Sequence, residues 1–215
     1  MKKSLWLVCI VLIVIAVYFF NISFRTGNGK AELSFGNNPA SLTDKNTVLI
    51  PTDSGVNYQA FSNQSAKYQI NLPSNWTKTY STSSGDKIAQ DIFEPSDKVQ
   101  NSGKLIQVIA FTYQAYTNNN GSRLTNKEIV GHELNAMKQG PFPTAQDVHV
   151  YESKTDSNTY VANFSFTNNG KTSKVIAQFA FGATSFYDVL AVVPNDINEQ
   201  EFSPIQISLS SFRTK

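Results

Sequence analysis

One segment of this 215-residue chain indicates how the rest is arranged around it: Leu105-Ile106-Gln107-Val108-Ile109-Ala110-Phe111-Thr112-Tyr113. It is almost continuously apolar, and this pattern predicts a central β-strand that is buried on both faces. Other segments alternate polar and apolar residues, which is typical of strands with one buried face. We expect these further strands at residues 67–72, 87–94, 147–154, 159–167, 173–181 and 186–193. The sequence Asn168-Asn169-Gly170-Lys171 predicts a hairpin turn between two of them, because Asn and Gly tolerate positive φ.

Two helices are predicted between and after these strands. Thr125-Asn126-Lys127-Glu128 matches a capping box, and an apolar stripe of Val130, Leu134 and Met137 follows until Gly140-Pro141 ends the helix. Near the C-terminus, Ile205, Leu209 and Phe212 fit helical spacing, although Ile205, Ile207 and Leu209 also alternate as in a strand. Ser203 before Pro204 favours a helix that begins with Pro at its first position.

The N-terminus has the pattern of a membrane anchor. No charged residue occurs from Ser4 to Phe24, and this length is sufficient to cross the hydrocarbon core of a bilayer. The run ends in the bulky residues Val17-Tyr18-Phe19-Phe20, whereas a cleaved signal peptide ends in small residues, so we favour an uncleaved anchor. Lys2 and Lys3 predict that the N-terminus lies in the cytoplasm and the rest of the chain outside it.

The chain therefore divides into three parts by composition. Residues 1–25 form the predicted anchor, and residues 26–57, which are rich in Gly, Asn, Ser, Thr and Pro, form a flexible tether. Residues 58–215 form one folded domain. The single Cys excludes a disulfide framework and a zinc site built from cysteines. Without Lys2 and Lys3 the basic and acidic residues are equal in number, which argues against nucleic-acid binding.

Two histidines are the residues most open to a chemical interpretation. His132-Glu133 begins like a zinc-peptidase motif, but Ala136 stands where the second His is required, so we expect His132 to form an exposed pair with Glu128. His149 and Asp147 lie on one face of a predicted strand by period two, as does Tyr151. His149 and Asp147 are the candidates for a divalent-cation site, which needs a third ligand from elsewhere in the chain.

The order of elements resembles that of the PsbP-like domain family. Tyr68-Gln69-Ile70-Asn71-Leu72-Pro73-Ser74-Asn75-Trp76 is similar to the opening strand of these domains, and the aromatic strand Phe186-Tyr187-Asp188-Val189-Leu190-Ala191 before a closing helix is similar to their end. The resemblance implies an α+β fold: an α/β/α sandwich around a central, mainly antiparallel sheet, here preceded by an N-terminal transmembrane helix. It also implies a non-catalytic, accessory binding role. We expect no cofactor other than a divalent cation, for which His149 and Asp147 are the candidates.

Our leading hypothesis is thus a single-pass protein of the cytoplasmic membrane that is not an enzyme. Its domain would face outward and bind a protein partner as an accessory or assembly factor for a membrane or envelope complex. The alternative is a small extracytoplasmic hydrolase or metal-dependent enzyme whose site is built from dispersed residues. A cleft holding His149 beside two carboxylates would favour that alternative.

Overall fold

The computed structural model describes residues 55–83, 88–96, 103–118, 120–153 and 158–215. The predicted anchor and most of the predicted tether lie outside these residues. Within the described ranges, no helix combines the length and the apolar character needed to cross a membrane.

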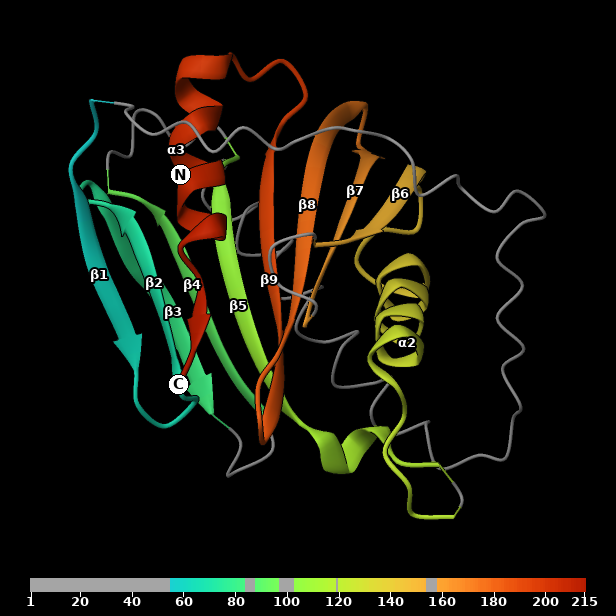
Figure 1. Cartoon of the computed structure of the whole chain (residues 1–215). Helices are drawn as coiled ribbons and strands as arrows, with labels where there is room; N and C mark the ends of the chain where they lie inside the picture. The colour runs from blue at the N-terminus through green and yellow to red at the C-terminus, as the bar shows by residue number, and fades with distance from the viewer. Residues whose placement is uncertain (1–54, 84–87, 97–102, 119, 154–157) are drawn as a thin grey trace.

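The larger of two sheets has seven strands in the order β3-β4-β5-β9-β8-β7-β6, and every neighbouring pair is antiparallel (Figure 1). Its strands are β3 (Trp76–Ser83), β4 (Ile88–Pro95), β5 (Leu105–Thr112), β6 (Gln146–Glu152), β7 (Thr159–Asn168), β8 (Lys171–Phe181) and β9 (Ser185–Pro194). Six of β5's residues in a row are buried, which confirms the doubly buried strand expected from the sequence. The hairpin turn between β7 and β8 is also confirmed, because Asn169 and Gly170 have φ values of 48° and 74°.

A smaller sheet joins segments that are far apart in the sequence. It has the order β1-β2-β10 and consists of β1 (Tyr58–Asn63), β2 (Tyr68–Pro73) and β10 (Arg213–Thr214). The sequence predicted β2 but neither β1 nor β3, because both are edge strands in which polar residues dominate. Trp76, the first residue of β3, is 5% exposed and belongs to the core beneath this small sheet.

The two helices cover opposite faces of the seven-stranded sheet. One core, called the first core below, joins α3 (Glu199–Ser210) and β2 to Val108 and Val189. The second core joins α2 (Asn126–Gln139) to Ile109 and Leu190. Adjacent residues of a strand point to opposite faces, so the sheet lies between the two cores. The structure confirms the α+β class and the mainly antiparallel sheet.

Helix α2 forms as its sequence predicts. Thr125 accepts a hydrogen bond from the Glu128 amide, and the Glu128 carboxylate accepts one from the Thr125 amide at 2.7 Å, which completes the capping box. The pKa of Glu128 is lowered, first by the Thr125 hydroxyl, then by the Thr125 amide, and last by the nearby His132. His132 thus lies close enough to Glu128 to contribute to this shift, but it is half-buried and not on the fully exposed surface that we expected.

Helix α3 begins earlier than predicted. Its N-cap is Asn198, whose side chain accepts a hydrogen bond from the Glu201 amide at 2.9 Å, so Pro204 lies inside the helix and not at its first position. Pro204 is the sixth of the twelve residues of the helix, and its missing N–H removes one intrahelical hydrogen bond. A capping Asn followed three residues later by Glu is a stronger local start signal than Ser203-Pro204.

Candidate functional site

The predicted cation candidates lie on β6, at the edge of the seven-stranded sheet. His149 pairs with Asn163 of β7, and the register shifts between Gln146 and His149. Asp147 sits in this bulge with φ of 53°, so the period-two alternation that placed Asp147 and His149 on one face is interrupted there. Both residues are exposed. Among the described residues, no group of three or more His, Cys, Asp or Glu side chains gathers in a way that could hold a metal ion.

His149 instead belongs to a surface that the small sheet and α3 leave open. Cross-strand register places the same-face residues of β6, β7 and β8 side by side, on the face of the first core. We call this set the open surface; it consists of His149, Tyr151, Val161, Asn163, Ile176 and Gln178. All of these side chains are half-buried except His149, which is exposed. Val161 packs against neither core.

The open surface is chemically mixed. The Asn163 amide donates a long hydrogen bond of 3.4 Å to the Tyr151 hydroxyl, while the Asn163 carbonyl oxygen is buried and accepts no hydrogen bond in the described part of the chain. A buried amide oxygen is normally satisfied by a donor. The surface thus combines aromatic, aliphatic, amide and imidazole groups, which suits recognition of a partner by contact and hydrogen bonding.

The densest polar network in the described structure surrounds Asp91 on β4. Its Oδ2 accepts hydrogen bonds from the Tyr68 hydroxyl at 2.5 Å and from the Asn63 amide at 2.7 Å. Its Oδ1 accepts one from Ser81 at 2.6 Å and lies 3.5 Å from the Lys78 ammonium. Asp91 is 1% exposed. Because both oxygens are occupied and the residue is buried, the carboxylate is not placed to act as a general base.

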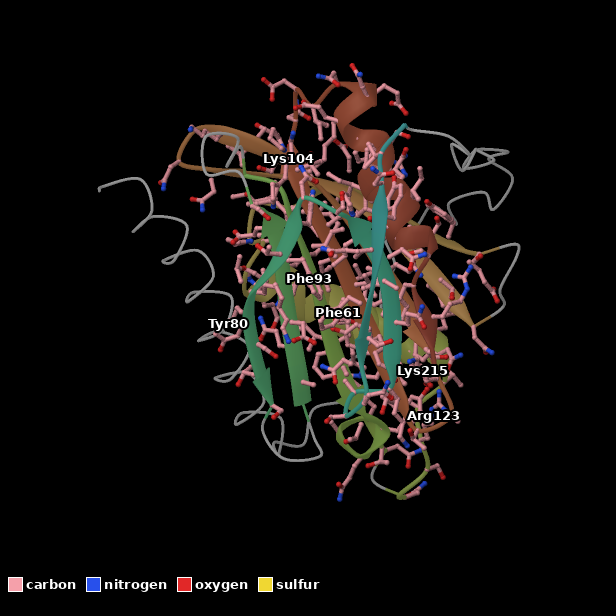
Figure 2. All side chains as sticks on the ribbon, turned by 90° about the vertical axis from the view of Figure 1, so that its left-hand side faces the viewer. Phe61, Tyr80, Phe93, Lys104, Arg123 and Lys215 are labelled. Carbon is pink, nitrogen blue, oxygen red and sulfur yellow. The ribbon has the colours of Figure 1, made fainter. Side chains whose placement is uncertain are left out.

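The Asp91 network attaches the small sheet to the large one. Asn63 ends β1 and Tyr68 begins β2, whereas Asp91 lies on β4 of the other sheet. Beside it, the rings of Phe61 and Phe93 meet edge to face, with 4.8 Å between centroids (Figure 2). Burial, followed by the hydrogen bond to Asp91, raises the pKa of Tyr68, so this hydroxyl stays protonated and donates. No sequence pattern points to this network, because Asn63, Tyr68, Ser81 and Asp91 are ordinary polar residues in four different strands.

A second buried carboxylate lies in the other core. Glu133 of α2 is fully buried and accepts a hydrogen bond from the Tyr116 hydroxyl. The Tyr116 ring in turn packs edge to face on Phe186, with 4.7 Å between centroids. Glu133 therefore fixes the segment before α2 against the sheet rather than facing a cleft.

Comparisons with known proteins identify the architecture. Neither the scan against protein-family models nor the search of curated proteins found a match. Among solved structures, the cyanobacterial PsbP of Synechocystis is similar, with a TM-score of 0.53 and 10% identity over 74% of this chain and 94% of that protein. LpqN of Mycobacterium tuberculosis, described as involved in cell envelope biogenesis, has a TM-score of 0.41 and 14% identity over 75% and 87% of the two chains. A Bacteroides thetaiotaomicron protein has a TM-score of 0.43 and 14% identity over 73% of this chain; the chain spans about half, 48%, of that protein.

At 10% identity, the likeness to cyanobacterial PsbP concerns the fold and not the activity. It agrees with the element order that the sequence suggested: an aromatic-led strand ending in Pro and Trp, a middle helix, antiparallel strands and a closing helix. The described domain therefore has the PsbP-like fold.

Proposed function

We propose that this chain is a membrane-anchored binding module that presents a PsbP-like domain outside the cytoplasmic membrane. It would bind a protein of a membrane or envelope complex as an accessory or assembly factor and would catalyse no reaction itself. The charge-free stretch from Ser4 to Phe24 supports the anchor, and the fold supports the accessory role.

The observation that carries the proposal is the open surface. Two of the sheet's outer strands keep side chains such as Tyr151 and Val161 half-buried while α3 and the small sheet pack elsewhere. In contrast, two of the three buried carboxylates among the described residues, Asp91 and Glu133, accept hydrogen bonds from the protein's own hydroxyl groups; the third is Asp188. Val56 is the single large hydrophobic side chain with high exposure in the described residues, so a partner would meet a mixed polar surface rather than a large apolar patch.

Photocrosslinking in the native membrane tests this function. A photoreactive residue would replace Val161 on the open surface, and a control variant would carry it at Gln139, which is exposed at the end of α2 on the opposite face. We expect the Val161 position to capture one membrane or envelope protein reproducibly and the Gln139 position to capture it weakly. Equal capture at both positions, or none at yields that work for a control complex, would contradict the proposed binding surface.

A further inference from the structure

Four exposed basic side chains gather at one end of the domain. We call this group the basic end; it consists of Lys67, Arg123, Arg213 and Lys215. Strand β10 pairs with β2 so that Arg213 lies opposite Gln69, and the Lys215 amide donates to the Lys67 carbonyl at 2.8 Å. The C-terminal residues are thereby fixed beside the turn between β1 and β2.

Arg123 joins the group from a different part of the chain. Its guanidinium lies 3.4 Å from the centroid of the Tyr113 ring, and the Tyr113 hydroxyl donates to the Gly182 carbonyl at 2.7 Å. Gly182 is so close to Thr214 that an added Cβ would approach the Thr214 Cβ to 3.3 Å. Contacts thus run without interruption from Arg123 to the C-terminal strand, and Figure 2 shows Arg123 and Lys215 together at the end opposite Lys104.

The positive charge of the basic end is not neutralised by carboxylate side chains of the described residues. Lys215 donates to the Ser62 hydroxyl at 2.9 Å, Arg213 to the Ser210 carbonyl at 2.7 Å and Arg123 to the Asn126 side chain at 2.7 Å, all of which are neutral acceptors. The surplus positive charge of the basic end therefore rests on these four side chains together.

Acidic residues gather where β4 and β9 end and α3 begins, at the other end of the domain. They are Glu94, Asp196, Glu199 and Glu201. The nearest described acid along the chain from Arg123 is Glu128, whose carboxylate is engaged by Thr125. The same end also carries Lys171, Lys174 and Lys104, which pairs with Glu201 at 2.7 Å, so its charges nearly balance, whereas the basic end has a surplus of positive charge.

The partner that fits this surface is a membrane surface that presents many phosphodiester anions. The inference rests on the membrane anchor of the proposed function, because an anchored domain is held near its own bilayer. A flexible chain of 32 residues, the length of the tether predicted at 26–57, has a root-mean-square reach of about 30 Å and would give an effective concentration in the millimolar range. Each Lys or Arg near an anionic membrane surface strengthens binding about fivefold, so four together are sufficient at that concentration.

We propose that the basic end docks on anionic phospholipid headgroups of the membrane that carries the anchor. Docking sets the orientation of the domain and turns the acidic end, where Lys171 and Lys174 also lie, away from the bilayer. The interaction is reversible and weakens with salt, because exposed charges are screened by salt.

Native lysines report the orientation directly. The full-length protein would be placed in nanodiscs of neutral phosphatidylcholine, or of phosphatidylcholine with about one third anionic phosphatidylglycerol, a fraction that gives a negative surface potential. A water-soluble acetylating reagent then labels exposed lysines, and mass spectrometry follows each site. We expect Lys67 and Lys215 to react severalfold more slowly in the anionic nanodiscs, with Lys171 and Lys174 unchanged. The protection should disappear at about 0.5 M salt, where the Debye length is only a few Å.

Two variants sharpen the result. The double substitution Arg123→Glu and Arg213→Glu should remove the protection of Lys67, whereas Arg123→Lys and Arg213→Lys should keep it. Equal labelling rates at both ends in anionic nanodiscs would overturn the proposal. Protection by soluble polyphosphate without protection by anionic lipid would also overturn it, in favour of a soluble polyanion.

The outcomes separate this inference from the proposed function. Failure of the full-length protein to stay with the nanodiscs would refute the anchor and the docking together. Lysine protection without crosslinking at Val161 would support docking on lipid while contradicting the protein partner.

Discussion

Removal of the Asp91 carboxylate should loosen the small sheet from the large one. Asp91→Ala deletes the acceptor for three hydrogen bonds, from Asn63, Tyr68 and Ser81. Tyr68 suffers most, because it is 1% exposed and its hydroxyl cannot turn to bulk water. The stability of the domain should fall in a single step, since the first core extends through both sheets.

The size of the loss follows from the environment of each donor. A hydrogen bond to a charged group contributes about 1.5–3 kcal/mol, and leaving its buried partner unsatisfied has a comparable cost. Asn63 and Ser81 are partly buried, so water can replace part of the hydrogen bonding that they lose. The Lys78 ion pair contributes little to the free energy of unfolding, because Lys78 is 37% exposed. We therefore expect a loss of about 3–5 kcal/mol, most of it from the Tyr68 hydroxyl, which loses a charged acceptor and stays buried.

Urea unfolding of the full-length protein in detergent micelles, followed by circular dichroism, measures this loss. Asp196→Ala is the matched control, because Asp196 is exposed at the other end of the domain; it should change the free energy of unfolding by less than about 0.5 kcal/mol. Tyr68→Phe should cost about 2 kcal/mol, and the double variant should cost less than the sum of the two single ones, because both remove the same bond. A loss below about 1 kcal/mol for Asp91→Ala would refute the view that this network attaches the small sheet.

Three other perturbations have defined outcomes. The pKa of Tyr68 is raised in the folded state, so the unfolded chain loses this proton first as pH rises past about 10. The free energy of unfolding should then fall by about 1.4 kcal/mol per pH unit because of this group. Urea titrations at several pH values should show a shallower fall for Tyr68→Phe. Thr125→Ala removes the cap of α2 and should lower the free energy of unfolding by about 1 kcal/mol in the same assay. Gly170→Ala should cost about 1–2 kcal/mol, because φ is 74° there, while no atom stands within 4 Å of the added Cβ.

The Thr125 and Gly170 predictions have control variants in the same chain. Thr184→Ala changes an exposed Thr outside any helix cap and should leave the free energy of unfolding nearly unchanged. A similar loss for both Thr variants would argue against the capping role of Thr125. Gly170→Asn should recover much of the loss, since Asn tolerates positive φ; an equal loss for Ala and Asn would point to a cause other than the backbone. For Tyr68, an unchanged alkaline slope in the Phe variant would show that other groups control the decline.

The sequence was sufficient for elements whose local signal has no competing signal nearby. The β5 strand was visible as an unbroken apolar run, and α2 was visible because its capping box and apolar stripe lie within a few turns. The α3 start was placed too late, because Ser203-Pro204 imitates a helix start that Asn198 and Glu201 provide earlier. Strands β1 and β3 carried too few apolar residues to be recognised, since an edge strand is defined by its neighbours as much as by its own pattern.

Some features of the candidate sites could also be predicted from the sequence, and others could not. His149 and Asp147 were found from residue type and spacing, but the bulge at Asp147 breaks the alternation on which their grouping relied. The open surface could not be read from the sequence, because it depends on which half of the sheet α3 and the small sheet cover. The Asp91 network was equally hidden, since Asn63, Tyr68 and Ser81 reach one carboxylate from three different strands.

The charge-free N-terminal stretch, the strand and helix periods and the hairpin turn at Asn169-Gly170 can be recognised in the sequence alone, because each depends on neighbouring residues. Contacts between distant segments become visible in the folded chain and not before. The composition of the chain outside Lys2 and Lys3 is neutral, yet the pairing of β10 with β2 brings Arg213 and Lys215 beside Lys67, and the hydrogen bond from Tyr113 to Gly182 brings Arg123 toward them. The net charge of a sequence carries no information on the positions of its charges, because these positions follow from contacts between residues that are far apart in the chain.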